Sequence, residues 1–349
     1  MKTIAVVGGH GQVGKGNVRE LTNHGYFVVL MGRNLKKMEV FAQEFLPILE
    51  QSEVDLNKFV IPEKLADLDM VIVCLDQTDT QFVEQCQKLG IDYLDISANS
   101  DFLKKVNLLP IPEKSKRVIG LGLAPGVTNL AAAAYTKKEP SAQMIVIDVL
   151  LGIGDRHGEA AVRWTFEQLN RTYIHPKWAQ PIENFVYSRK TDFGPPFGKR
   201  RSANFGFADQ HLLFSADPSR NYVTFLGLDQ NWLTALLRTI KKVGLARLFK
   251  NPRVIKSPVW FMKRGLVGDR SFVVKVSNGQ VKDPEKIVLF GEEEAKMTAE
   301  IAVFVANKIL IETLPNGHYH LTELTTKSEI LSRLPRLSAT EYIEKLFTL

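Results

Sequence analysis

The chain has few cysteines and no long apolar run. Its 349 residues include only two cysteines, Cys74 and Cys86, which is too few for a disulfide framework, and no residues have the spacing of a metal site. Four apolar residues, 4–7, precede the first glycine cluster, and no run approaches the roughly 18 residues of a membrane span. We therefore expect a cytoplasmic protein that is neither exported nor membrane-spanning and holds no metal.

The most informative motif is the glycine cluster that follows the apolar strand 3–7. Its G-x-G-x-x-G spacing, a helix with Val18 and Leu21 on one face, and a second strand at 26–31 together form a dinucleotide-binding βαβ unit. We expect the first glycine to allow the turn, the second to admit a pyrophosphate, and the third to let the helix pack closely. The residues expected to contact the dinucleotide here are Gly9, His10, Gly11, Gln12, Val13 and Gly14.

The end of the second strand indicates which dinucleotide binds. NAD-binding proteins place Asp or Glu about 20 residues beyond the glycines, whereas this chain has Arg33 and Asn34, with Lys36 and Lys37 close behind. A guanidinium matches a 2′-phosphate, and no carboxylate repels it, so the sequence favours NADP over NAD. The alternative is that Arg33 only ends a solvated loop.

Strands and helices alternate over the first half of the chain, which predicts a doubly wound parallel α/β sheet. Ligands of such sheets lie beyond the carboxyl ends of the strands, so the loops 76–79, 97–99 and 122–129 are candidate site loops. Each is also compatible with ordinary turn chemistry. From them we add four cofactor-binding residues: Cys74, Leu75, Asp76 and Ala98.

Beyond residue 140 the pattern changes to that of a second, α+β domain. Its first polar loop contains Asp155, Arg156 and His157, which we expect to be catalytic. His157 suits proton transfer near neutral pH, Arg156 can hold a carboxylate, and Asp155 can orient the imidazole. The alternative is that Asp155 is a helix N-cap and the other two are solvated. Arg163 and the pair Arg200 and Arg201 are weaker anchors.

These patterns predict three segments. Residues 1–135 form the Rossmann domain, residues 136–291 form the α+β substrate and dimerisation domain, and residues 292–349 are C-terminal helices that return to the Rossmann domain. Within these segments we expect a helix at 38–49, a strand at 184–187 and a terminal helix at 339–347.

The net charge of +7 is concentrated in residues 230–268, which lack Asp and Glu. Apolar residues, including Trp232, alternate there with nine basic residues: Arg238, Lys241, Lys242, Arg247, Lys250, Arg253, Lys256, Lys263 and Arg264. Such a stretch can meet nucleic acid, an anionic membrane or an acidic partner. We favour a solvated basic helix whose apolar side packs on its own domain, with no nucleic acid and with peripheral membrane contact through 232–264 as the less favoured alternative.

Several motifs together resemble the saccharopine dehydrogenase (reductase) family. They are the glycine loop with Gly32-Arg33, the strand and loop around Val73-Cys74, and the segments 90–96, 120–129 and 298–300. The resemblance implies a Rossmann domain and a substrate domain inserted before the C-terminal helices. We also expect a homodimer. It also implies NAD(P)-dependent hydride transfer to or from an imine or secondary amine derived from an amino acid, or a small carbonyl compound. The alternatives are a non-catalytic NADP-bound sensor or scaffold, and an oxidoreductase for lipid-like substrates.

Overall fold

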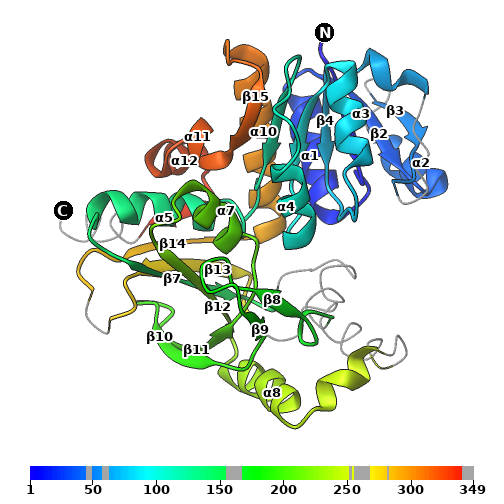
Figure 1. Cartoon of the computed structure of the whole chain (residues 1–349). Coiled ribbons are helices and arrows are strands. Elements are labelled where there is room, and N and C mark those ends of the chain that lie inside the picture. Colours follow the sequence, from blue (N-terminus) through cyan, green and yellow to red (C-terminus); the bar gives the residue numbers. More distant parts are fainter. Residues whose placement is uncertain are drawn as a thin grey trace, which may run out of the picture. The chain divides into compact units, whose positions relative to one another are not determined.

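The computed structural model describes residues 1–44, 49–56, 63–154, 167–250, 254, 268–280 and 283–339. Their contacts form two compact units. Unit 1 contains Met1–Gly126 and Ala295–Thr326, and unit 2 contains Val127–Glu294 and the chain from Lys327 onward. Figure 1 shows both. The units are described separately below.

Unit 1 is built on a seven-stranded sheet in the order β15-β6-β5-β4-β1-β2-β3, with every pair parallel. Its strands are β1 (Thr3–Val7), β2 (Phe27–Gly32), β3 (Leu49–Glu53), β4 (Met70–Val73), β5 (Asp92–Asp95), β6 (Lys116–Ile119) and β15 (Gly317–His320). Its helices are α1 (Gln12–Asn23), α2 (Leu35–Ala42), α3 (Gln81–Leu89), α4 (Ser100–Asn107), α11 (Leu321–Leu324) and most of α10 (Glu294–Ile311), with the 3-10 helix η1 at Glu63–Asp67.

The core of unit 1 follows from its sequence pattern. Strands β1 and β4 are buried along nearly their whole length, as expected for parallel strands covered on both faces. Helix α1 buries Val18 and Leu21, the residues of its predicted apolar face. A Cβ on Gly16 would lie 2.7 Å from the Cβ of Ala299, so this glycine lets α1 and α10 approach closely.

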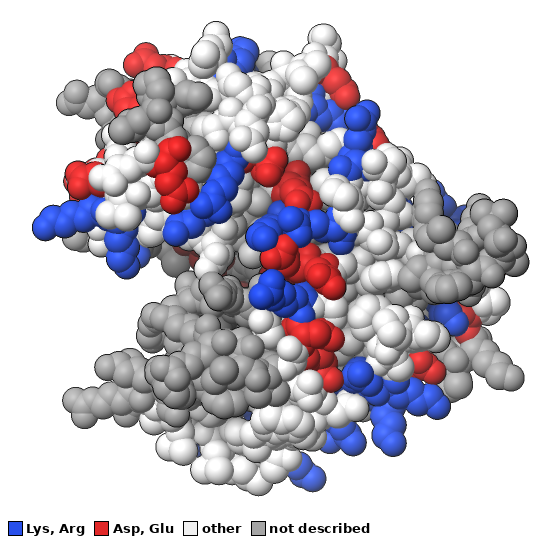
Figure 2. Space-filling view, turned by 180° about the vertical axis from the view of Figure 1, so that it is seen from behind, with Lys and Arg blue, Asp and Glu red and all other residues white. Residues whose placement is uncertain are grey.

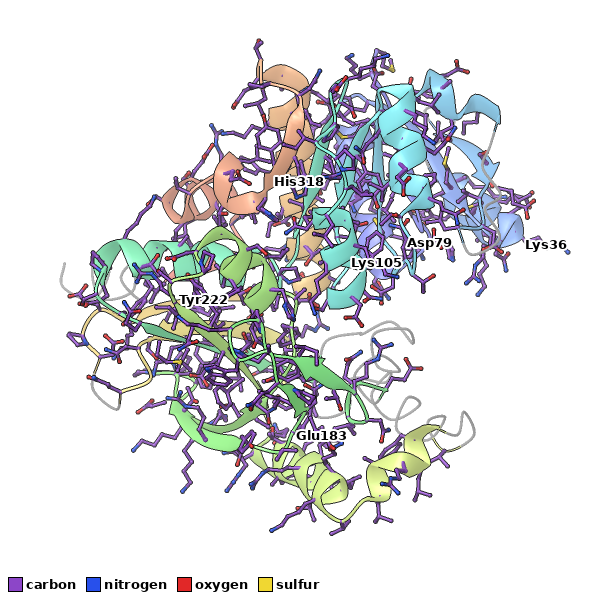
Figure 3. The ribbon with its side chains drawn as sticks, viewed as in Figure 1. Lys36, Asp79, Lys105, Glu183, Tyr222 and His318 are labelled. Carbon is purple, nitrogen blue, oxygen red and sulfur yellow. The ribbon has the colours of Figure 1, made fainter. Side chains whose placement is uncertain are left out.

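A buried arginine joins the edge strand β15 to the sheet. Arg117 on β6 is completely buried and donates from Nε to His318 Nδ1 at 2.9 Å and from a guanidinium nitrogen to Gln87 Oε1 at 2.8 Å. Burial and the nearby Arg117 charge lower the pKa of His318 to about 3, which keeps its imidazole neutral and able to accept this hydrogen bond. Figure 3 labels His318 on this strand.

Unit 2 is built on a mixed seven-stranded sheet in the order β10-β11-β12-β7-β13-β14-β16. Only β7 and β12 pair in parallel among its described strands. The strands are β7 (Met144–Leu151), β10 (Ser188–Asp192), β11 (Lys199–Asn204), β12 (Asn221–Leu228), β13 (Ser271–Ser277), β14 (Ile287–Glu292) and β16 (Leu337–Ala339), with a separate pair β8 (Thr172–Ile174) and β9 (Pro181–Glu183).

Helices cover this second sheet. They are α5 (Val127–Lys138), α7 (Asp209–Ala216), α8 (Asn231–Lys242) and α12 (Lys327–Arg333), with the 3-10 helix η2 at Leu245–Lys250. Helix α5 packs on β13 and β14, α7 on β12, and α8 on β11 and β12. The expected fold class, a doubly wound parallel Rossmann sheet with a second α+β domain, is confirmed.

Three expected elements differ from the structure. Helix α2 ends at Ala42, and Leu49, placed in that helix, begins β3. Residues 184–187 form the turn between β9 and β10, where Asn184 is tied by its side-chain amide to the Gln168 carbonyl at 2.9 Å. Ala339 ends β16, and the rest of the expected terminal helix lies outside the described residues.

The boundaries of the two units also differ from the boundaries of the predicted segments. The first unit ends before α5, whereas the predicted Rossmann domain runs to 135. Helix α10 returns to unit 1, but β16 pairs with β14 in the sheet of unit 2.

Candidate functional site

The glycine loop between β1 and α1 has a separate role for each glycine. Gly8, with φ +78°, makes the turn, a role expected of Gly9. A Cβ on Gly9 would lie 2.1 Å from Leu30 Cδ1, and one on Gly14 would lie 2.5 Å from both Gly8 O and Gly9 Cα. These two glycines therefore permit packing. At Gly11 a Cβ would meet a single atom, Gly8 O, at 3.2 Å, so that position is less enclosed than Gly9 and Gly14.

The start of α1 has the properties of an anion site. Gly11 is its N-cap and supplies no side chain to its first turn, and that turn contains no acidic residue. The free N–H groups of a helix N-terminus carry partial positive charge. Of the predicted contacts here, Gln12 is exposed and Val13 is half-buried. This loop can accept the pyrophosphate of a dinucleotide.

Three cations lie close enough to His10 to affect its ionisation. Burial lowers the pKa of His10 first, and the charges of Lys37, Lys15 and Arg33 lower it further. The imidazole stands over the end of β2, because a Cβ on Gly32 would lie 3.3 Å from His10 Nδ1. This nitrogen is buried and has no hydrogen-bond partner. The cations come from α1, from the residue after β2, and from α2.

Asn34 and Lys36 lie near these three cations but are not part of the group around His10. Asn34 Oδ1 accepts a hydrogen bond from the Lys37 backbone N–H at 3.0 Å, so Asn34 is the N-cap of α2. Lys36 is exposed, and Figure 3 shows its side chain extending away from the unit. Lys36 does not contribute to the shift at His10.

A second polar cluster lies where β4 and β5 end. Tyr93 donates to Asp95 Oδ2 at 2.5 Å, Gln77 Nε2 donates to the same oxygen at 3.0 Å, and the Ser97 backbone N–H donates to Oδ1 at 2.6 Å. Asp95 is completely buried, and desolvation raises its pKa to about 7 despite these donors. Figure 3 labels Asp79 and Lys105 at this edge of the sheet.

Gln77 was missed by sequence reasoning as an individual site residue, although its loop was identified. Its Nε2 also donates to Tyr93 Oη at 2.6 Å, which fixes the orientation of the amide. The amide oxygen is left buried and without a partner. Asn17, on α1, similarly donates to Cys74 Sγ at 3.2 Å and keeps a buried, unpartnered Oδ1. The hydrogen bonds that fix these two amides join residues distant in the chain, so only the fold identifies their oxygens as free acceptors.

The predicted residues after β4 and β5 lie around these clusters. Leu75 Cδ2 and the Cys74 carbonyl oxygen lie within 3.0 and 3.4 Å of a Cβ position on Gly8, so they line the glycine loop. Asp76 is exposed and accepts from Ser97 Oγ at 2.8 Å, and Ala98 is half-buried in the loop after β5. Desolvation raises the pKa of the Cys74 thiol to about 12, which keeps it protonated.

The third predicted loop ends at the start of α5, within unit 2. Thr128 and Asn129 are buried there. The Thr224 hydroxyl donates to Oδ1 of Asp209 at 3.1 Å, and Asp209, the first residue of α7, is completely buried. Desolvation raises the pKa of Asp209 to about 6. Sequence reasoning did not identify this carboxyl, because its partners are distant in the chain.

The predicted catalytic residues Asp155, Arg156 and His157 lie outside the described residues, as does Arg163. Within the described part of the chain, no three His, Cys, Asp or Glu side chains are grouped to hold a metal ion. No helix in that part has the length and apolarity to cross a bilayer.

Comparison with known proteins gives a match to a family model and a structural likeness over nearly the whole chain. The model of the saccharopine dehydrogenase NADP-binding domain matches residues 4–147. The solved structure of saccharopine dehydrogenase (L-Glu forming) from Saccharomyces cerevisiae is 12% identical, with a TM-score of 0.60, and the match covers 97% of this chain and 100% of the yeast chain. At that identity the likeness shows a shared fold.

Two further solved structures match less of the chain. The WlbA dehydrogenase from Thermus thermophilus is 12% identical, with a TM-score of 0.34 over 65% of this chain and 73% of its own. The yeast methylglyoxal/isovaleraldehyde reductase Gre2 is 16% identical, with a TM-score of 0.24 over 34% of this chain and 37% of its own. No curated protein sequence matches the chain.

Proposed function

Because the model of the saccharopine dehydrogenase NADP-binding domain matches residues 4–147 of this chain, we propose that the chain is an NADP-dependent oxidoreductase. Its substrate would be an imine or secondary amine derived from an amino acid, or a small carbonyl compound. The observation that carries the proposal is the open glycine loop at Gly11 beside the three cations around His10.

The cofactor preference follows from charge. A 2′-phosphate adds about two negative charges to the adenosine ribose, and Lys15, Arg33 and Lys37 supply matching cations. NADH has only a hydroxyl at this position and gains nothing from them. We therefore assign the 2′-phosphate to these residues and the pyrophosphate to the loop Gly8–Gly11 with the first turn of α1.

Equilibrium binding of NADPH and NADH to three variants tests this assignment. Arg33→Gln and Lys37→Gln should each weaken NADPH binding by about 1–3 kcal/mol and leave NADH binding unchanged. Lys36→Gln is the matched control, because it removes an exposed neighbouring charge that does not act on His10. Equal affinity of the parent for NADPH and NADH would contradict the assignment.

The nicotinamide would supply a hydride to the carbon of a C=N or C=O bond, while the protein supplies a proton to the nitrogen or oxygen. His157 stays our proposal for that proton, with Asp155 orienting it and Arg156 holding a substrate carboxylate. Gln77 Oε1 and Asn17 Oδ1 are unpartnered acceptors near the ends of β1 and β4, and we assign them to N–H or O–H groups of the bound cofactor.

Kinetics with the substrate separate these roles. A screen of keto acids, amino acids, amines and enones with NADPH identifies an activity. His157→Ala should then lower kcat with little change in NADPH affinity, and Arg156→Ala should mainly raise KM for an acidic substrate. Variants indistinguishable from the parent would remove this loop from the mechanism, and Asp95 or Ser97 would be examined next.

We also propose a cytoplasmic homodimer. The cytoplasmic location is supported by Cys74 and Cys86, which are both free thiols. Sedimentation velocity over a range of concentrations tests the dimer, and a constant monomer mass would contradict it.

A further inference from the structure

Helix α8 presents some of its apolar side chains outward. Trp232 and Leu236 on the helix and Val243 just after it follow one another at helical spacing, and they are 54%, 44% and 59% exposed. The apolar side of a surface helix is normally the one that is buried. Leu237 of the same helix is buried, as expected for an apolar side that packs on its own domain, whereas Trp232, Leu236 and Val243 stay exposed.

Contacts on the other side of α8 fix this orientation. Leu237 is buried, and Thr234 Oγ1 accepts the backbone N–H of Leu228 at 2.9 Å. Lys241 Nζ lies 2.7 Å from Glu183 Oε2, and only 13% of the Lys241 side chain is exposed. Turning the helix to bury Trp232 would break these contacts, so the outward apolar face is a stable feature of unit 2.

The apolar surface continues beyond the helix. Leu245 and Leu248 on η2 are both more than half exposed. The exposed Val186 and Tyr187 adjoin α8, because Arg238 Nε donates to the Val186 carbonyl at 3.4 Å. We call these residues the α8 surface: Val186, Tyr187, Trp232, Leu236, Val243, Leu245 and Leu248.

Cations surround the α8 surface. Lys242 and Arg247 are exposed beside it. The start of β11, Lys199–Arg201, is held against α8, since the Arg201 backbone N–H donates to Asn231 Oδ1 at 2.8 Å. Glu183, one of the acids near α8, is paired with Lys241. Figure 1 labels helix α8, and Figure 2 shows Lys and Arg in blue among uncharged residues in white on one face of the molecule.

We propose that the α8 surface docks reversibly on an anionic lipid bilayer. Apolar side chains that include Trp and Tyr enter the interface between headgroups and acyl chains, and flanking Lys and Arg pair with acidic headgroups. A second copy of this chain fits less well, because a symmetric contact would bring the same cations together. A nucleic acid would need the cations but not the exposed Leu and Val side chains. The proposal does not depend on the proposed oxidoreductase function.

Vesicle flotation with the full-length protein tests the proposal. The parent should float with vesicles of phosphatidylcholine and phosphatidylserine, bind pure phosphatidylcholine much less, and lose affinity in high salt because surface charges are screened. Lys242→Gln and Arg247→Gln should each weaken binding to anionic vesicles about fivefold. Lys114→Gln and Lys137→Gln, at exposed positions elsewhere, are the matched charge controls and should bind like the parent.

A second pair of variants tests the apolar contribution. Trp232→Ser with Leu236→Ser should abolish flotation, whereas Leu108→Ser with Ile111→Ser, which removes exposed apolar residues from unit 1, should not. Circular dichroism confirms that each variant is folded. Trp232 fluorescence, isolated by comparison with Trp232→Phe, should be quenched by lipids that carry a quencher in the acyl chain.

Three results would overturn the proposal. The first is that the parent does not bind anionic vesicles. The second is that the folded Trp232→Ser, Leu236→Ser variant floats as well as the parent. The third is that the parent forms a concentration-dependent dimer and binds no vesicles, and that this variant does not dimerise. The last result would assign the surface to a second copy of the chain.

Discussion

The carboxyl of Asp95 should make stability depend on pH in a way that one substitution removes. In the unfolded chain its pKa is near the ordinary value of 3.8, whereas burial raises it to about 7 in the folded protein. Between these values the folded state holds a proton that the unfolded state has lost. The free energy of unfolding therefore falls as the pH rises from about 4 to about 7, and this contribution is constant above that range.

The size of the effect follows from linkage. One proton of difference corresponds to about 1.4 kcal/mol per pH unit, and the whole shift corresponds to about 4 kcal/mol. Asp95→Asn keeps the shape of the side chain and removes the titration. We expect the decline in stability between about pH 5 and pH 7 to be less steep in this variant by about 1.4 kcal/mol per unit. Asp209 adds a similar decline at slightly lower pH in both proteins.

Urea unfolding at several pH values measures this difference, and carbon-13 NMR of the Asp95 carboxyl locates its titration directly. Asp67→Asn, at an exposed carboxyl of the same unit, is the control and should keep the pH dependence of the parent. Parallel pH profiles for the parent and Asp95→Asn would refute the assignment of the raised pKa to Asp95.

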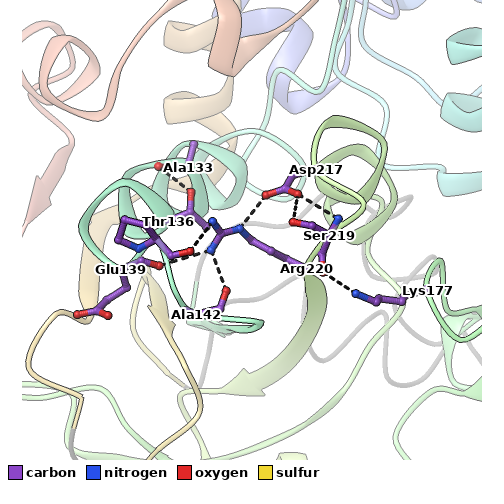
Figure 4. Close-up of polar contacts among 9 residues, drawn as sticks. Ala133, Thr136, Glu139, Ala142, Lys177, Asp217, Ser219 and Arg220 are labelled. Carbon is purple, nitrogen blue, oxygen red and sulfur yellow. Dashed lines mark hydrogen bonds and ion pairs between the residues drawn. The ribbon is translucent and has the colours of Figure 1, made fainter.

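Three further outcomes follow from the contacts. Gly11→Val should leave the protein folded, because its Cβ meets only Gly8 O. It should abolish NADPH binding, because the side chain fills the space assigned to the pyrophosphate. A folded variant that binds NADPH like the parent in a titration would contradict this. Gly14→Ala should instead lower the free energy of unfolding by about 1–3 kcal/mol, measured by urea unfolding, because its Cβ meets the backbone at 2.5 Å. Arg220→Met should lower the free energy of unfolding by about 2 kcal/mol in the same assay. Arg220 donates to Asp217 Oδ2 at 2.7 Å and to the Ala142 and Pro140 carbonyls beyond α5 at 2.8 and 2.9 Å (Figure 4). Unchanged stability would show that water replaces these bonds.

The local pattern of the sequence determined the Rossmann half. The apolar strand, the glycine spacing and the helix face of Val18 and Leu21 are all set by residues close in the chain, so the βαβ unit was predictable. The absence of an acidic residue at position 33 likewise indicated the charge at the end of β2. Local sequence patterns gave wrong elements where contacts between distant residues decide the structure. Leu49 was predicted in a helix but pairs with β2 in the sheet, and residues 184–187 were predicted as a strand but form a turn.

Only the tertiary structure decided which polar groups meet. Gln77, Tyr93 and Asp95 are brought together by the parallel pairing of β4 and β5, and the pKa of about 7 arises from burial that no local pattern reveals. Asp209 on α7 and Thr224 on β12 meet because this helix packs on that strand. Helix α8 shows the same limit. Its sequence determined which residues are apolar, but the contacts of Thr234, Leu237 and Lys241 decided that Leu237 is buried and that Trp232 and Leu236 face outward.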